Sequence, residues 1–139
     1  MVPGGRIAIW GTDYATAKDA QGNTRVVARP AGLRLVDPDG WTARLLESRA
    51  DSARAVTGEL VATGPGVGLE GFGFNGDLWF RTLRGRNVWL EEAYGTRLFV
   101  QIGSSKRLKV VDLVRRRVVG ERKSTPPWLL VDGAWTPWS

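Results

Sequence analysis

The sequence predicts an all-β fold of antiparallel strands, on three observations. Eighteen glycines, seven prolines and seven tryptophans in 139 residues favour many short strands joined by tight turns. Apolar residues alternate with polar ones, which places them on one face of a strand, and no segment shows the period of about 3.6 residues that marks an amphipathic helix. The third observation is that one β-hairpin pattern occurs three times.

The clearest copy of this hairpin spans residues 32–46, GLRLVDPDGWTARLL. Leu33 and Leu35 point to one face of the first strand, because successive side chains alternate. The turn lies at Asp39-Gly40, where proline and glycine residues favour a tight loop. We therefore expect two paired strands with one apolar face.

Two further copies follow, at 68–83 and, in weaker form, at 108–120. The second copy carries Asn75-Gly76 at the turn. Each copy is preceded by a segment that reads as a charged residue, an apolar run and a glycine: 6–11, 59–64 and 97–103. Residues 127–131 open a fourth such segment, so a strand is expected before each hairpin. In the segment 97–103, alternation is expected to turn Leu98, Val100 and Ile102 inward.

Outside the three hairpins and the strands before them, the sequence predicts few further elements. Strands are also expected at 53–56 and 88–94, and a short helical turn is possible at 47–51. Residues 12–32 form a long polar interruption, in which only Val26–Ala28 is expected to be a strand. Loops of this length in compact domains are either functional or loosely ordered.

The spacing of the copies predicts their architecture. Leu33, Leu69 and Leu108 are separated by 36 and 39 residues, and repeats of about 40 residues with four strands each are typical of propeller blades. GLRLVDPDGWTARLL and TRLFVQIGSSKRLKVVDLVRRRVVGER resemble blades of the YVTN or quinoprotein-like β-propellers. The resemblance covers roughly residues 6–131 and implies antiparallel propeller-like blades with at most a binding role.

The length predicts a single repeat-built domain over 1–139, with units at roughly 6–52, 53–95 and 96–139. Three blades do not close a ring, since propellers have about four to eight. Three solutions stay open: copies of the chain assemble into a ring, the chain is a piece of a longer propeller, or the strands close as a small antiparallel barrel or sandwich. The expected partner is therefore the chain itself or another protein.

Composition limits the chemistry. The chain has no cysteine and no histidine, which removes thiol nucleophiles, the commonest general base and the usual zinc ligands. Glu91 and Glu92 are neighbours on a strand and point to opposite faces, the wrong geometry for joint acid–base work. We expect no enzyme activity, no cofactor and no metal. No apolar run of 18 residues and no secretion signal is visible, so no membrane partner and a cytoplasmic location are expected.

Within the polar interruption, we expect Asp13, Tyr14, Lys18 and Arg25 to contact any bound ligand, because they offer oxygens, an aromatic ring and cations. The competing interpretation is a solvated loop whose Asp and Asn residues form turns. The expected function is a non-catalytic binding or protein-interaction module of unknown ligand.

Two alternative ligands follow from charge and from tryptophan. Residues 81–123 hold 12 basic and 4 acidic side chains, and Arg115, Arg116 and Arg117 are the expected contacts of a polyanion. Nucleic acid is possible but not favoured, because these arginines form a loop cluster rather than a groove. Exposed tryptophans such as those of the C-terminal tail, Trp128, Trp135 and Trp138, could instead stack on sugars.

Overall fold

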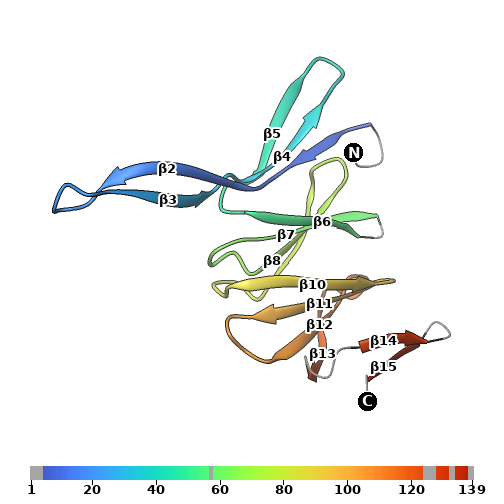
Figure 1. Cartoon of the computed structure of the whole chain (residues 1–139). Coiled ribbons are helices and arrows are strands. Elements are labelled where there is room, and N and C mark those ends of the chain that lie inside the picture. Colours follow the sequence, from blue (N-terminus) through green and yellow to red (C-terminus); the bar gives the residue numbers. More distant parts are fainter. Residues whose placement is uncertain (1–4, 57, 124–127, 132–133, 138–139) are drawn as a thin grey trace.

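Three antiparallel sheets stacked one upon another form the body of the molecule in the computed structural model (Figure 1). The structure describes residues 5–56, 58–123, 128–131 and 134–137. The predicted all-β class is confirmed, and none of the sheets formed by the described residues closes into a barrel. Within the same ranges there is no helix with the length and apolar character needed to cross a bilayer.

The first sheet has the strand order β1-β4-β5. Its strands are β1 (Ile7–Ile9), β4 (Leu33–Asp37) and β5 (Thr42–Glu47). Between β1 and β4 the chain leaves the sheet as a separate hairpin of β2 (Thr12–Lys18) and β3 (Thr24–Pro30), which projects sideways in Figure 1.

This hairpin corrects the prediction for residues 12–32, where a strand was expected only at Val26–Ala28. The two strands pair without interruption from Thr12↔Pro30 to Lys18↔Thr24. The turn is held by the side chain of Asp19, whose Oδ1 accepts from the backbone N–H groups of Gln21 and Asn23. Sequence inspection failed here because the hairpin is exposed on both faces, so it lacks the apolar alternation of a half-buried strand.

A second correction concerns residues 47–51, where a short helical turn was considered. β5 extends to Glu47, and the Glu47 carboxylate accepts from the backbone N–H of Arg49 at 3.1 Å. The chain then turns directly into β6 (Ser52–Val56).

The second and third sheets are four-stranded meanders with the strands in chain order. The second contains β6, β7 (Glu59–Thr63), β8 (Leu69–Gly73) and β9 (Leu78–Thr82). The third contains β10 (Val88–Tyr94), β11 (Arg97–Ile102), β12 (Arg107–Asp112) and β13 (Arg117–Lys123). The boundary between these sheets therefore lies between β9 and β10, whereas the sequence division was placed after residue 95.

A two-stranded sheet of β14 (Trp128–Val131) and β15 (Ala134–Pro137) follows the third sheet. The strand expected from residue 127 onward is thus present from Trp128. The side chains of the tail tryptophans, and Trp138 altogether, lie outside the described residues, as does Pro127.

The predicted hairpins are all formed, as β4–β5, β8–β9 and β12–β13, and each follows a strand that pairs with its first member. The turns also match in detail. Asp37 and Asp112 end the first strands, and each carboxylate accepts from a backbone N–H two residues further on. Trp41, Gly76 and Arg116 occupy corresponding tip positions, all with positive φ, of 53°, 95° and 59°.

Two apolar cores lie between the stacked sheets, and the second sheet contributes to both. We call the face of the second or third sheet that is turned toward the preceding sheet its N-side face, and the opposite face its C-side face. In the first sheet, the C-side face is the one turned toward the second sheet, and the opposite face is the N-side face. On β7, Leu60 and Ala62 point from the N-side face into the core shared with the first sheet, and Val61 points from the C-side face into the core shared with the third. β7 and β8 are consequently buried on both faces, whereas the expected inward set of β11 packs on the second sheet: Leu98, Val100 and Ile102.

Candidate binding site

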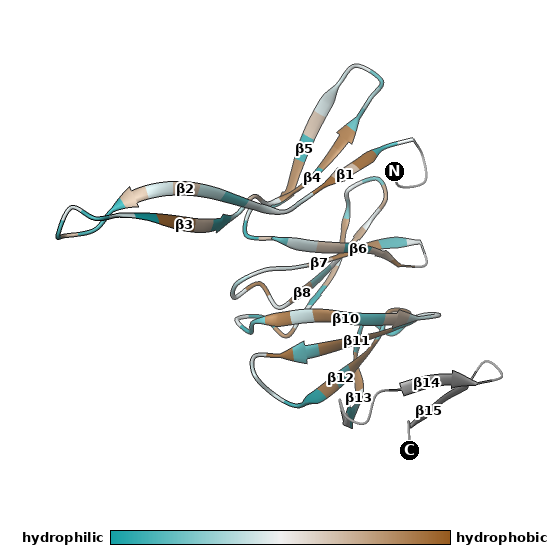
Figure 2. Cartoon of the chain, viewed as in Figure 1, coloured by the Kyte–Doolittle hydropathy of each residue, from teal (hydrophilic) through white to brown (hydrophobic). Residues whose placement is uncertain are grey.

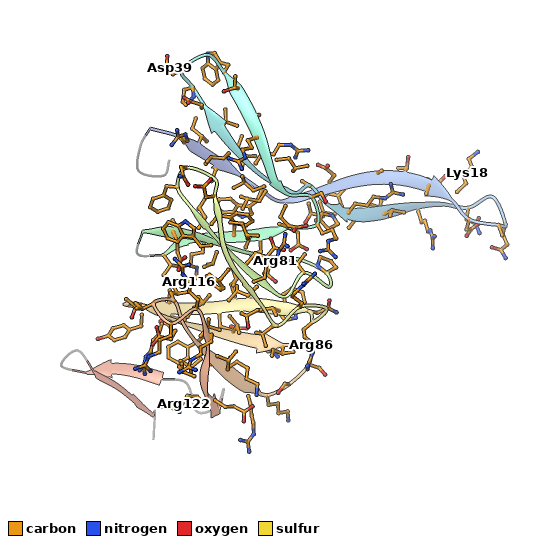
Figure 3. All side chains as sticks on the ribbon, turned by 180° about the vertical axis from the view of Figure 1, so that it is seen from behind. Lys18, Asp39, Arg81, Arg86, Arg116 and Arg122 are labelled. Carbon is orange, nitrogen blue, oxygen red and sulfur yellow. The ribbon has the colours of Figure 1, made fainter. Side chains whose placement is uncertain are left out.

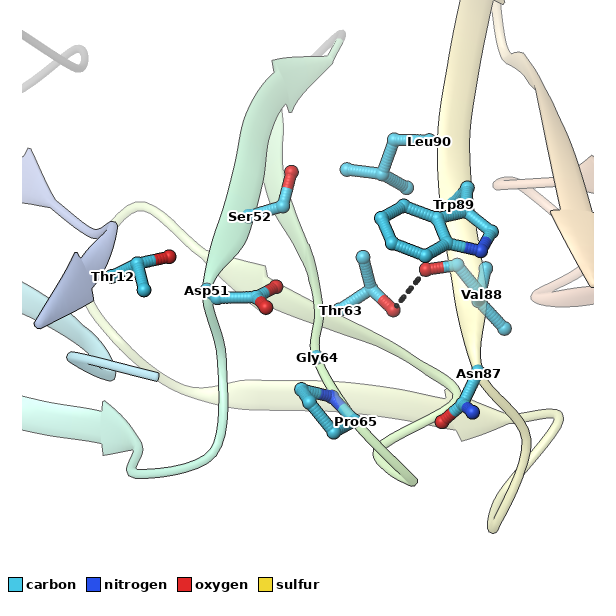
Figure 4. A pocket seen from close by; sticks show the side chains of 10 residues that line it. All are labelled: Thr12, Asp51, Ser52, Thr63, Gly64, Pro65, Asn87, Val88, Trp89 and Leu90. Atoms are coloured by element: carbon cyan, nitrogen blue, oxygen red, sulfur yellow. Dashed lines mark hydrogen bonds between the residues drawn. The ribbon is translucent and has the colours of Figure 1, made fainter. Parts of the chain in front are cut away.

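A pocket of about 390 Å³ opens between the second and third sheets, at the edge formed by their first strands, β6 and β10 (Figure 4). One wall comes from the start of β6 and another from the start of β10, and the end of β7 with the turn after it lies between them. The lining residues are Thr12, Asp51, Ser52, Thr63, Gly64, Pro65, Asn87, Val88, Trp89 and Leu90.

Hydrogen bonds between side chains and the backbone hold these walls in place. The hydroxyl of Thr63 lies 2.7 Å from the carbonyl oxygen of Gly68 and 2.9 Å from that of Val88, so it joins the two sheets at the pocket floor (Figure 4). The Asn87 Oδ1 atom accepts from the backbone N–H of Gly66 at 2.8 Å. Both contacts therefore tie the pocket walls to the ends of neighbouring strands and turns.

The groups that line the pocket define its chemistry. The side chain of Trp89 is 60% exposed and offers an aromatic surface. Asp51 forms no ion pair with any described residue, and burial raises the pKa of its carboxyl group. Ser52 and Asn87 add a hydroxyl and an amide. No lysine or arginine lines the pocket, so the site suits a ligand with hydrogen-bonding groups and no negative charge.

No family model, no curated protein and no solved structure matches the chain. Among the described residues there is also no group of three or more carboxylates placed to hold a metal ion.

The four residues expected to contact a ligand lie on the projecting hairpin, and the strands separate them. Tyr14 pairs with Ala28, and its face of β2 also carries Lys18. Asp13 and Arg25 lie on the opposite face, since side chains alternate and Ala17 pairs with Arg25. Lys18 is near the far end of the hairpin (Figure 3). These residues therefore share a face only in pairs, and none of them lines the pocket.

The expected polyanion contacts lie at the tip of the β12–β13 hairpin. The guanidinium carbon of Arg116 is 5.3 Å from the centroid of the Trp79 ring, and Nη1 donates to the Trp79 carbonyl oxygen at 3.3 Å. Arg116 therefore joins the third sheet to β9 of the second sheet by a cation–π contact. Arg115 lies in the turn and Arg117 begins β13, and all three arginines are exposed.

Two buried glutamates face the sheet junctions. Glu70 on β8 is 1% exposed and faces Glu47 of the first sheet, while Arg81 Nε lies 3.5 Å from its Oε1 atom. Burial, together with the neighbouring Glu47 carboxylate, raises the pKa of Glu70 to about 7. Burial likewise raises the pKa of Glu59 to about 7, partly offset by the positive charge of Arg116.

Sequence reasoning did not find the pocket. Its residues come from four separate segments, and only their pairing in the sheets brings them together. The available signals were the Gly64-Pro65-Gly66 turn and the exposed Trp89 on an edge strand.

Proposed function

We propose that the chain is a non-catalytic binding module of propeller type and that the pocket between β6 and β10 is its ligand site. The observation that carries this proposal is the lining of the pocket, which combines an exposed indole with a carboxylate, hydroxyls and an amide. The lining includes no pair of groups suited to acid–base or nucleophilic catalysis.

The stacking of similar sheets supports the propeller interpretation. The second and third sheets have the same four-stranded meander and pack face to face. In a propeller, corresponding strands of successive blades line a central channel. The pocket lies beside β6 and β10, the first strands of their sheets, where such a channel would run.

We further propose a neutral, polyhydroxylated ligand such as a sugar. The indole of Trp89 would stack on the apolar face of the ring, while Asp51 and Asn87 would bind hydroxyl groups. A volume of about 390 Å³ lies in the range of small-molecule sites. Polyanion binding at the arginine cluster has less support, because Arg116 is already engaged with Trp79.

The test is titration of the protein with a panel of methyl glycosides, followed by NMR of the tryptophan indole N–H signals. We expect saturable shifts of the Trp89 signal, at least tenfold weaker binding for Asp51→Asn, and no binding for Trp89→Ala. Tyr14→Ala is the matched control, because it removes another exposed aromatic side chain that does not line the pocket.

Tetramethylammonium and heparin complete the set of probes. Binding of tetramethylammonium without any glycoside would replace the sugar by a cationic ligand, since a carboxylate beside an indole also suits a cation. Salt-sensitive binding of heparin, lost in Arg115→Ser/Arg117→Ser, would favour the polyanion alternative. Absence of saturable glycoside binding would refute the proposed ligand class.

A further inference from the structure

No other sheet of the described residues covers the N-side face of the first sheet, and apart from Arg34 this face is formed by apolar residues. On β1, Ile7 and Ile9 point to this face, because they pair with Val36 and Arg34 of β4. The face continues on β5 through Ala43 and Leu45. Ile9 is 51% exposed and Leu45 49%, and β1 and β4 carry apolar segments in Figure 2.

The same positions are buried in the other two sheets. Ile7 corresponds to Leu60 in the second sheet and to Leu98 in the third. Each of the three residues pairs with the same position of the strand that begins the predicted hairpin of its sheet. Ile9 corresponds in the same way to Ala62 and Val100. These four counterparts are at most 1% exposed. In the second and third sheets, the preceding sheet covers the N-side face. The first sheet has the same apolar pattern on this face, but no described sheet covers it.

The contacts of the hairpin tips indicate which kind of surface would cover this face. Arg116, at the tip of β12–β13, lies over Trp79 on the last strand of the preceding sheet. Gly76, at the corresponding tip of β8–β9, comes so close to β5 that an added Cβ would lie 3.1 Å from the Arg44 guanidinium and 3.2 Å from Leu46 Cδ2. Each tip therefore contacts the last strand of the sheet before it.

Trp41 occupies the corresponding tip of the first sheet, and no sheet of the described residues lies before it. Its side chain is 75% exposed and its φ is +53°, a conformation that is costly for a bulky residue. An exposed, strained indole at the rim of an uncovered apolar face is typical of an interface anchor.

We propose that this face binds the C-terminal end of a second copy of the chain, so that Trp41 lies over β13 of that copy. The proposal goes beyond the ligand site and uses different residues. The position on β13 that corresponds to Trp79 is Val119, since each is the extra residue of a β-bulge in its strand. Val119 is 36% exposed and lies on the last strand of its sheet, so a hairpin tip of another copy can contact it.

A second copy fits better than an unrelated protein because this kind of contact already occurs twice within one chain. Within one chain, the second and third sheets each place their N-side face on the C-side face of the sheet before them. Packing the first sheet of one copy in the same way on the third sheet of another copy gives a head-to-tail contact. Such a contact closes into a ring or extends into a filament, according to the rotation between copies.

The first experiment is light scattering as a function of concentration. The wild-type mass is expected to rise above the single-chain mass of 15.2 kDa. Ile9→Lys should weaken association more than tenfold, because it places a charge in an apolar contact. Val26→Lys is the matched control, since Val26 is exposed on the projecting hairpin, and it should associate like wild type. Circular dichroism verifies that both variants fold. A wild-type chain that keeps the single-chain mass at every concentration overturns the proposal.

The second experiment maps the contact. Trp41 is replaced by photoreactive benzoylphenylalanine, and this variant is mixed with a ¹⁵N-labelled wild-type chain before irradiation. The expected product joins position 41 to the labelled tryptic peptide 118–122. The same photoreactive residue at Tyr14 should not label that peptide. Crosslinks from position 41 to the first sheet of the partner would instead show a two-fold pairing and overturn the head-to-tail arrangement.

Discussion

Replacing Glu70 by glutamine should remove much of the pH dependence of stability at the junction of the first two sheets. Glu70 is almost completely buried, and the charged groups around it are the carboxylate of Glu47 and the guanidinium groups of Arg49 and Arg81. Its pKa is raised from 4.5 to about 7. The folded state therefore binds this proton more tightly than the unfolded chain does.

The direction of the effect follows from linkage. A raised carboxyl pKa contributes stability that is complete below about pH 4.5 and is lost as the pH rises through about 7. Each pKa unit corresponds to about 1.4 kcal/mol, so the whole shift amounts to at most about 3 kcal/mol. Glutamine stays neutral and keeps the shape and a donor for Glu47. Glu70→Gln should therefore be more stable than wild type at pH 8 by up to about 3 kcal/mol, and close to wild type at pH 5.

Urea unfolding at pH 5 and pH 8, followed by tryptophan fluorescence, measures this difference. Glu91→Gln is the control, because Glu91 is exposed on β10. Since Glu59 has a similarly raised pKa, Glu59→Gln/Glu70→Gln should show the weakest pH dependence of all. If the free-energy difference between Glu70→Gln and wild type is the same at both pH values, the assigned pKa shift of Glu70 is refuted.

Two further predictions concern the joints of the stack. Gly68→Ala should lower the free energy of unfolding by about 2 kcal/mol or more, since its φ is +76° and an added Cβ would lie 2.3 Å from the Leu83 carbonyl oxygen. Gly85→Ala has a similar φ of +77° in open space and should cost only about 1 kcal/mol, so equal losses in urea unfolding would contradict the close approach. Arg116→Ala should cost about 1 kcal/mol through loss of the cation–π contact with Trp79, and a stability equal to wild type would show that this contact is incidental.

Local patterns in the sequence were sufficient to predict the repeated hairpins. Alternation of apolar and polar residues and the Asp-Gly and Asn-Gly turns depend only on neighbours along the chain, and the inward set of β11 was predicted correctly for the same reason. The β2–β3 hairpin was missed because its stability comes from cross-strand pairing rather than from a buried face, and exposed pairing leaves a weak pattern in the sequence.

The division of the candidate site residues illustrates the limit of such reasoning. Asp13, Tyr14, Lys18 and Arg25 are close in sequence, yet strand pairing places them on two faces. Asp51 and Trp89 are 38 positions apart and line one pocket.

The sequence by itself determined the all-β class and the hairpin turns, because these arise from short-range alternation and from the backbone preferences of glycine and proline. Only the tertiary structure decided how the sheets stack, which apolar face stays uncovered and which distant side chains share a pocket. These features depend on strand register and on contacts between sheets, since a single step in register would turn every side chain to the opposite face.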